Sequence, residues 1–358
     1  MTTPLFVEIR DEIVEAGPMS LARYMALCLG HPIHGYYRTR DPLGARGDFV
    51  TAPEISQMFG ELIGIWIAVT WASMGGPSDL VLTELGPGRG TLMADALRAL
   101  GRAAPDFQPA VHLVETSPLL RAAQASRLGA VSPTWHDGIE TLPEGPMIVV
   151  ANEFFDALPV RQFQRTERGW CERLVGLSPD GGRLTFGLAA EPDCEISAPA
   201  PVGVLMTVPA PALDIARNLS RRIVAQGGAL LAIDYGHVRP GFGDTFQAVS
   251  AHRFADPLLS PGEADLTTHV DFAALGRAAR GEGARIDGPL EQGAFLLNLG
   301  LRQRADRLKV GASRAQADAV DTAFHRLTAS GKRGMGSLFQ AIGIADPRLP
   351  VLSGFNPA

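Results

Sequence analysis

The sequence contains few cysteines, and their spacing is uninformative. Only Cys28, Cys171 and Cys194 occur in 358 residues, far apart and without a C-x-x-C pair. An odd number of widely separated cysteines argues against a disulfide framework, and the lack of paired ligands argues against a zinc site. We therefore expect three reduced thiols and no bound metal.

The chain also lacks a long apolar run and an excess of basic residues. No window approaches the roughly 18–20 consecutive apolar residues of a membrane span. The stretch MTTPLFVEIRDEI has neither the apolar core of a signal peptide nor the acid-poor character of a transit peptide. A formal net charge of −6 gives no support to a nucleic-acid partner. With 46% apolar residues, the composition predicts a globular cytoplasmic enzyme without a membrane span.

Helical patterns dominate residues 1–75, which we assign to an N-terminal helical extension with a lid. Apolar spacing predicts a helical pair over 4–30, followed by the aperiodic segment HPIHGYYRTRDPLGARGDF, an ordered loop or lid. TAPEISQMFGELIGIWIAVTW is expected to form one helix, with Thr51 and Glu54 at capping-box spacing. Its expected apolar stripe consists of Ile55, Met58, Phe59, Leu62, Trp66 and Val69.

Short apolar runs separated by helices begin at residue 79. DLVLTEL, AVHLVET, PMIVVAN and GGALLAIDYG are apolar on both faces, as buried parallel strands are. The helical stretches TLMADALRALGR and SPLLRAAQASRLG lie between the first pairs. This alternation predicts an α/β fold with a Rossmann-like, doubly wound sheet over residues 76–290.

Two further regions complete the expected organisation. WCERLVGLSPDGGRLTFGL alternates apolar and polar residues around an Asp-Gly-Gly turn, which predicts a β-hairpin at about 168–190, inserted at the carboxyl edge of the sheet. A helix is expected near 271–281, and residues 291–358 are expected to form a mostly helical region packed on the core.

The stretch ELGPGRGT, residues 84–91, places three glycines at alternate positions after the first apolar run. A strand that ends in a glycine turn and opens a helix directs backbone N–H groups and the positive helix end at a ligand. Gly86, Gly88 and Gly90 depart from the dinucleotide fingerprint G-x-G-x-x-G, and the turn lacks the lysine of a P-loop. ATP and GTP are therefore disfavoured. With Glu84, the spacing E-x-G-x-G-x-G resembles the motif of class I S-adenosylmethionine methyltransferases.

Acidic residues follow the next two strands of this region. Glu115 ends the second strand, where a carboxylate can accept both hydroxyl protons of a ribose, from NAD or from S-adenosylmethionine. WHDG places Asp137 shortly before the PMIVVAN strand, at a position where this fold contacts adenine. Both residues are therefore candidates for binding the adenosine part of a cofactor.

The segment VVANEFFDALP ends an apolar strand with Asn152, Glu153 and Asp156. Because the crevice of a doubly wound sheet lies beyond the carboxyl ends of its strands, these groups are expected to face a substrate. A carboxylate can bind a guanidinium bidentately and localise its charge away from one nitrogen. Glu153 is the first candidate for this role, and Asp156 is the second. Alternatively, Asn152 and Asp156 cap a following helix and Glu153 bonds a loop N–H.

Three other residues are candidates with open alternatives. Asp48 in ARGDFVT either contacts the donor's amino group or caps a helix. Tyr235 in AIDYGH either faces the sulfonium or the acceptor, or packs under a loop. His269 in ADLTTHVDF is either a general base or a structural hydrogen-bonding group.

Several blocks occur in an order that resembles the MidA-like methyltransferases: GDFVTAPEISQMFGELIGIW, TELGPGRGTLMADALR, LVETSPLLRAAQ, ANEFFDALPVRQF, AIDYG and GEADLTTHVDF. The resemblance runs from about residue 4 to about residue 343. It implies a class I methyltransferase fold, S-adenosylmethionine as donor and a protein arginine as acceptor. Because the family includes a mitochondrial arginine methyltransferase needed for complex I assembly, it also implies a complex I subunit as a target.

The resemblance also assigns residues to the donor site. The family's donor-binding positions fall on Glu84, Gly86, Gly88, Gly90, Glu115 and near Asn152 and Glu153, with Gly47, Asp48 and Phe49 at the mouth. Relatives often have Arg-Gly before His252, where this sequence has Ser250 and Ala251, so the role of that loop stays open.

Two alternatives to a methyltransferase belong to other functional classes. An NAD-dependent oxidoreductase would need its third glycine one position later. A non-catalytic assembly factor could keep the fold but would not need the glycine turn, Glu115 and Glu153. The hairpin and the C-terminal helices suit either a homodimer or a docking surface for a partner protein.

Overall fold

The computed structural model describes residues 3–39, 51–250, 253–331 and 334–356. Its centre is an eight-stranded sheet in the order β15-β16-β10-β5-β2-β3-β4, with β14 beside β10. The strands are β2 (Val81–Leu85), β3 (Ala110–Val114), β4 (Thr134–His136), β5 (Met147–Asn152), β10 (Gly228–His237), β14 (Val270–Asp271), β15 (Arg285–Glu291) and β16 (Phe339–Ala345). β2, β3, β4, β5 and β10 pair in parallel, whereas β16 is antiparallel to β10 and β15. The predicted doubly wound sheet is confirmed, and its order reverses between β2 and β5, where such sheets bind ligands.

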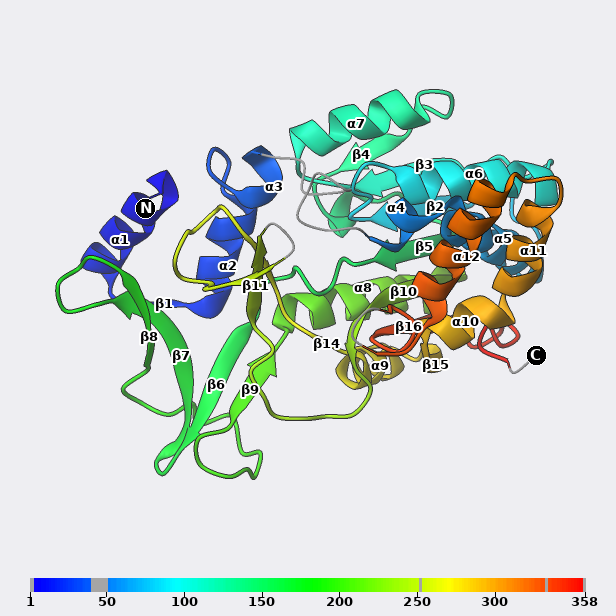
Figure 1. Ribbon diagram of the computed structural model, residues 1–358. Helices are drawn as coiled ribbons and strands as arrows, with labels where there is room; N and C mark the ends of the chain where they lie inside the picture. The colour runs from blue at the N-terminus through cyan, green and yellow to red at the C-terminus, as the bar shows by residue number, and fades with distance from the viewer. Residues whose placement is uncertain (1–2, 40–50, 251–252, 332–333, 357–358) are drawn as a thin grey trace.

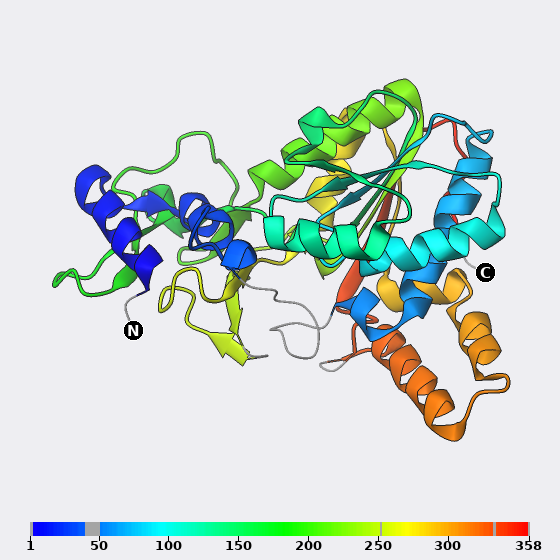
Figure 2. The same ribbon diagram turned by 90° about the horizontal axis from the view of Figure 1, so that it is seen from above.

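Helices cover both faces of this sheet. Successive side chains of a strand point to opposite faces, and in the buried strands both sets are apolar and pack against helices. In β5, Ile148 and Val150 pack into the core under α5 and α6, whereas Met147 and Val149 pack into the core under α8 and α9. The first face carries α5 (Gln57–Ser73), α6 (Thr91–Ala103), α10 (Gln292–Asn298), α11 (Leu301–Lys309) and α12 (Arg314–Thr328). The second face carries α8 (Ala210–Gln226) and α9 (Phe272–Gly281). Figures 1 and 2 show the strands enclosed between these layers.

A separate lobe with its own core lies on the other side of the molecule from the C-terminal helices (Figure 1). It contains α1 (Pro4–Ala16), α2 (Leu21–Gly30) and the five-stranded sheet β1-β7-β6-β9 with β8 beside β7. These strands are β1 (Met19–Ser20), β6 (Arg161–Thr166), β7 (Gly169–Leu177), β8 (Leu184–Leu188) and β9 (Leu205–Val208). The predicted hairpin is confirmed as β7 and β8, but it belongs to this second sheet. A three-stranded sheet of β11 (Gln247–Ser250), β12 (Arg253–Ala255) and β13 (Asp265–Thr267) contributes to the same core.

The predictions for the N-terminal region need four corrections. The expected single helix after Thr51 is broken into α4 (Ala52–Ile55) and α5, because Ser56 leaves helical geometry and its hydroxyl accepts from the N–H of Met58 at 3.2 Å. Thr51 makes no side-chain cap bond, so the predicted capping box is wrong. Val69, placed on the apolar stripe, is 43% exposed. The aperiodic segment includes a one-turn helix, α3 (Tyr36–Thr39).

The C-terminal region is less helical than expected. The helix predicted near 271–281 is confirmed as α9, and α10 to α12 follow. However, β15 and β16 are strands of the central sheet, and every residue of β16 is buried. In the part of the chain that the structure describes, no helix is both long and apolar enough to cross a membrane.

Candidate active site

A cavity of about 450 Å³ lies at the carboxyl ends of the central parallel strands. Its walls come from the turn after β2, the residues after β3, the loop after β5, the end of β10, and β13. Helices α2 and α3 of the N-terminal lobe, together with α4, complete it. The cavity therefore lies between the central sheet and the N-terminal lobe, at the place that the sheet topology predicts for a ligand.

The glycine turn forms one wall with its backbone. Gly86, Gly88 and Gly90 have φ values of 62°, 53° and 75°, in the left-handed region that favours glycine. A Cβ on Gly86 would lie 2.9 Å from Cδ2 of Phe154, so a side chain there would displace the loop after β5. Gly86 and Gly88 line the cavity, whereas Gly90 caps the N-terminus of α6. The predicted strand–turn–helix is confirmed.

Glu84, the last residue but one of β2, lines the cavity and is 2% exposed. Burial raises the pKa of its carboxyl to about 8, although the N–H of Met93 opposes the shift. Its Oε2 atom has no hydrogen-bond partner among the described residues. A buried carboxylate oxygen without a partner beside a cavity suits a ligand that brings a donor or a positive charge.

Glu115 is held from two sides. Its Oε1 accepts from the N–H of Ser117 at 2.8 Å, and its Oε2 accepts from the side-chain amide of Gln124 at 3.2 Å. Gln124 also donates to the carbonyl of Gly88 at 2.7 Å and accepts from the indole N–H of Trp135 at 2.7 Å. Burial raises the pKa of Glu115. Gln124 thus fixes the carboxylate relative to the glycine turn.

Asp137 lies at the exposed rim of the same cavity. Its side chain is 87% exposed and pairs with Arg121 at 2.7 Å. The buried Ile139 next to it also lines the wall. The structure therefore brings Asp137 to the same end of the cavity as Glu115, whose carbonyl also accepts from Arg121.

Glu153 occupies the start of the loop after β5 with a φ of 51°, unusual for a residue with a side chain. Its Oε1 accepts from the N–H of Ala52 and from the side-chain amide of Asn152, each at 3.2 Å. Burial in the cavity wall, and then the nearby charge of Asp156, raise the pKa of Glu153 to about 8. Asn152 also lines the cavity, and its Oδ1 has no partner within the described ranges.

Asp156 and Tyr235 line the cavity beside Glu153, whereas His269 does not. Burial raises the pKa of Asp156 to about 6, and the neighbouring Tyr235 hydroxyl opposes this shift. His269 packs edge-on against the ring of Tyr235, with 5.7 Å between centroids. The loop after β5 runs directly into β6, so the alternative in which Asn152 and Asp156 cap a following helix is wrong. The bond from Ala52 shows that Glu153 does bind a backbone N–H.

Four groups of the site were not predicted from the sequence. Asp265 of β13 and Tyr37 of α3 line the cavity, and the Tyr37 hydroxyl donates to Asp265 at 2.9 Å. Glu54 accepts from the hydroxyl of Thr91, next to the glycine turn, at 2.5 Å. Gln124 had a detectable signal, because a polar residue at a core-facing position of a helix needs a partner. Gly47, Asp48, Phe49, Ala251 and His252 lie outside the described residues.

The cavity is acidic. Its described lining includes eight carboxylates, namely Glu54, Glu84, Glu115, Asp137, Glu140, Glu153, Asp156 and Asp265. The one basic side chain in this lining is Arg89, which lies 3.7 Å from Glu54. Carboxylates that face a common space raise one another's pKa unless cations enter. The arrangement therefore suits a cationic ligand.

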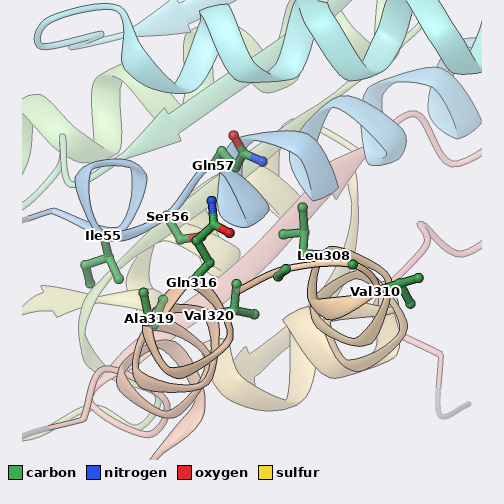
Figure 3. A pocket seen from close by; sticks show the side chains of 11 residues that line it. Ile55, Ser56, Gln57, Leu308, Val310, Gln316, Ala319 and Val320 are labelled. Carbon is green, nitrogen blue, oxygen red and sulfur yellow. The ribbon is translucent and has the colours of Figure 1, made fainter. Parts of the chain in front are cut away.

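A second hollow, of about 520 Å³, lies where the ends of α4 and α5 meet α11 and α12. Figure 3 shows Ile55 and Ser56 on one side of it and Gln316, Ala319 and Val320 of α12 on the other. Its described lining contains no ionisable side chain, so it offers none of the charged groups of the main cavity.

Comparisons with known proteins connect this geometry to a family. A family described as "Putative S-adenosyl-L-methionine-dependent methyltransferase" matches residues 62–290, from α5 to β15. The chain belongs to this methyltransferase family. The methyltransferase is 36% identical to the mitochondrial protein arginine methyltransferase NDUFAF7 homolog of Drosophila melanogaster, over 94% of this chain and 84% of the relative. It is 39% identical to human mitochondrial protein arginine methyltransferase NDUFAF7, over 84% of this chain and 74% of that protein.

A solved structure supports the same relationship. The methyltransferase superposes on a protein from Burkholderia thailandensis bound to S-adenosyl-homocysteine with a TM-score of 0.84 and 30% identity. The match covers 98% of this chain and 94% of the other. The predicted class of enzyme and its donor, S-adenosylmethionine, are therefore confirmed, and the NAD-dependent alternative has no support.

Proposed function

We propose that the methyltransferase transfers a methyl group to a nitrogen of arginine in a protein. The observation that supports this most directly is the acidic acceptor end of the cavity, where Glu153 and Asp156 lie together with raised pKa values. An arginine guanidinium stays positive in water and offers N–H groups in a planar fork that matches carboxylates. The names of the relatives, protein arginine methyltransferase, point to the same acceptor.

Residues at the other end fit the donor. The backbone of Gly86 and Gly88 suits close packing on the amino-acid part of the donor, with Gly90 placing the helix start behind it. The unpartnered oxygen of Glu84 would accept from the donor's ammonium group. Glu115 would accept from the ribose hydroxyls.

Two further residues fit the rest of the donor. Asp137, which lines the cavity at its rim near Glu115, would contact adenine. Asn152, which also lines the cavity, would offer its unpartnered Oδ1 to the donor. Asp48 keeps its predicted role at the mouth as a proposal.

When bound, S-adenosylmethionine supplies a sulfonium methyl: an N–C bond forms as the S–C bond breaks, and sulfur keeps the electron pair. The protein's part is to hold the guanidinium in line and to take up one proton. Glu153 in its ionised form would draw the positive charge to the nitrogens it binds and accept the proton that the reacting nitrogen loses. Tyr235 lines the cavity, and its ring and hydroxyl would contact the sulfonium or the guanidinium. His269 packs edge-on against the Tyr235 ring and would help to hold that ring in position.

The test is label transfer from radioactive S-adenosylmethionine into a lysate of a strain that lacks this gene. Labelled proteins are hydrolysed and their amino acids separated. Label in methylarginine supports the proposal, and label in another amino acid contradicts the acceptor. If no protein is labelled although the donor binds by calorimetry, the non-catalytic assembly factor is the better description.

A subunit of respiratory complex I is the proposed target, because the family resemblance implies it. Mass spectrometry of complex I subunits from the same strain tests this point separately. An unchanged arginine methylation pattern would remove this target and leave the enzyme class intact.

The setting of the enzyme is also a proposal. The named relatives are mitochondrial, whereas we infer a cytoplasmic site of action, without nucleic acid and with a homodimer as one assembly. Cell fractionation tests the cytoplasmic site, and analytical ultracentrifugation tests the homodimer.

A further inference from the structure

Asp265 reaches the acceptor end of the cavity from a distant part of the chain. It begins β13, is 5% exposed, and lines the same cavity as Glu153 and Asp156. The N–H of Thr268, just after β13, donates to the carbonyl of Asp156 at 3.0 Å. This backbone bond holds β13 beside the loop that carries the two predicted acceptor carboxylates.

Tyr37 of α3 also holds Asp265 in place. Its hydroxyl donates to Oδ1 of Asp265 at 2.9 Å, and its carbonyl accepts from the hydroxyl of Ser117 at 2.6 Å. The N–H of Ser117 in turn donates to Glu115 at 2.8 Å. The fully buried Tyr36 packs edge-on against the Tyr37 ring, with 5.2 Å between centroids. Tyr37 therefore connects the donor end of the cavity to Asp265.

Glu153, Asp156 and Asp265 line the same end of the cavity, close enough for their charges to interact. The negative charges of Asp156 and Asp265 both contribute to the raised pKa of Glu153. The one basic side chain in the described lining, Arg89, belongs to the glycine turn and lies beside Glu54. A positive ligand group at the acceptor end would lower the raised pKa values of Glu153 and Asp156.

We propose that Asp265 is a second acceptor-binding carboxylate, which grips the substrate guanidinium together with Glu153, and that Tyr37 is its positioning residue. The proposal rests on the proposed function, because it concerns the same acceptor. A planar guanidinium has five N–H donors and can satisfy carboxylates on two edges at once. A lysine ammonium is a compact charge on a flexible stem and does not match this fork. The pair would therefore select arginine over lysine.

The test compares Asp265→Asn and Tyr37→Phe with the wild-type enzyme. Both changes keep the size of the side chain, and the Asn oxygen can still accept from Tyr37. Rates are measured with radioactive S-adenosylmethionine over a dilution series of one lysate that lacks the gene, and donor affinity is measured by calorimetry. We expect Asp265→Asn to lower acceptor kcat/KM about 10- to 100-fold, the scale of one charged hydrogen bond, with donor Kd changed less than about 3-fold.

Tyr37→Phe keeps both carboxylates, so we expect mainly a rise in the apparent acceptor KM, about 3- to 10-fold. Tyr24→Phe is the matched control. Tyr24 is also a buried tyrosine of the N-terminal lobe, and its hydroxyl donates to the carbonyl of Pro257 at 2.5 Å, but it does not line the cavity. This variant should keep the acceptor KM of the wild type.

The outcomes separate the two proposals. If the wild-type enzyme labels methylarginine and both variants match its acceptor KM, the role of Asp265 is wrong while the proposed function stands. If Asp265→Asn instead weakens donor binding by more than about 10-fold, Asp265 serves the donor and the inference is overturned. If Asp265→Asn does not fold, Tyr37→Phe against Tyr24→Phe decides the question. If the wild-type enzyme labels no arginine, the proposed function fails and the inference fails with it.

Discussion

Asp234 holds Phe155 by a hydrogen bond from the backbone N–H to Oδ2 at 3.0 Å. The same oxygen accepts from the N–H groups of Phe154 and Asp156, each at 3.2 Å, and Oδ1 accepts from the N–H of Tyr235 at 2.9 Å. Asp234 is 1% exposed. One carboxylate on β10 therefore fixes the loop after β5, including the left-handed residue Glu153 at its start.

Asp234→Ala should destabilise the protein strongly. The change leaves four backbone N–H groups, two buried and two partly buried, without their acceptor, and each buried group costs about 1–3 kcal/mol. We expect the free energy of unfolding from urea titration to fall by more than about 3 kcal/mol. Asp271→Ala is the control, because Asp271 caps α9 through one N–H, that of Ala274, and a lost cap costs about 0.5–2 kcal/mol. Equal losses for the two variants would contradict the role of Asp234.

Glu153→Gln should separate donor binding from transfer. Glutamine keeps the shape of the side chain and can still accept from the N–H of Ala52, but it carries no charge for a guanidinium and takes up no proton. We expect donor affinity within about 3-fold of wild type and a loss of transfer of at least about 100-fold, the usual scale of a general base. Calorimetry and label incorporation measure the two quantities. Undiminished transfer would show that another group accepts the proton.

The pH dependence of the reaction should reflect the same residue. The pKa of Glu153 is raised to about 8 by burial and by Asp156, so the free enzyme holds this carboxyl neutral below that pH. Since only the ionised form can bind a guanidinium and accept its proton, acceptor kcat/KM should rise about tenfold per pH unit and level off at or below about pH 8, because the positive charge of the bound donor lowers this pKa. Initial rates at saturating donor, from about pH 6 to about pH 9, test this. A flat profile over that range would argue against Glu153 as the base.

The sequence was most informative about the central sheet. DLVLTEL, AVHLVET and PMIVVAN are apolar on both faces because helices cover both sides of β2, β3 and β5, so their burial can be read locally. The strand β16 could not be found in this way. It follows a long helical region and contains Gln340 and Gly343, and its partner β10 lies more than a hundred residues earlier. Its pairing is decided by tertiary packing.

The residues of the site also differ in whether the sequence alone predicts that they meet. Glu115, Glu153 and Asp156 follow strands of the central sheet, and the topology of a doubly wound sheet brings such positions together. Asp265 and Tyr37 are separated by 228 positions and belong to different small elements of the N-terminal lobe. No local sequence pattern predicts the contact between Tyr37 and Asp265, because this contact depends on how the N-terminal lobe packs against the sheet.

Glu84→Gln should stabilise the ligand-free protein while weakening donor binding. Burial raises the pKa of Glu84 from 4.5 to about 8, so between these values the folded state binds more protons than the unfolded state. Stability therefore falls as pH rises through that window, and at pH 7 the cost is at most about 3 kcal/mol, from 1.36 kcal/mol per pKa unit. Glutamine has no such cost, so its advantage in the free energy of unfolding should grow from about pH 4.5 to about pH 8. Urea titrations at several pH values measure it.

The loss of donor affinity is the second half of this prediction. An ionised Glu84 would attract the donor's ammonium group, and a charged hydrogen bond of this kind contributes about 1.5–3 kcal/mol. We expect S-adenosylmethionine to bind Glu84→Gln about 10- to 100-fold more weakly by calorimetry. The matched control is Glu282→Gln, because Glu282 pairs with Arg221 on the outer surface, away from the cavity. A Glu84→Gln variant that binds the donor like wild type, without a pH-dependent gain in stability, would mean that this buried carboxyl serves neither purpose.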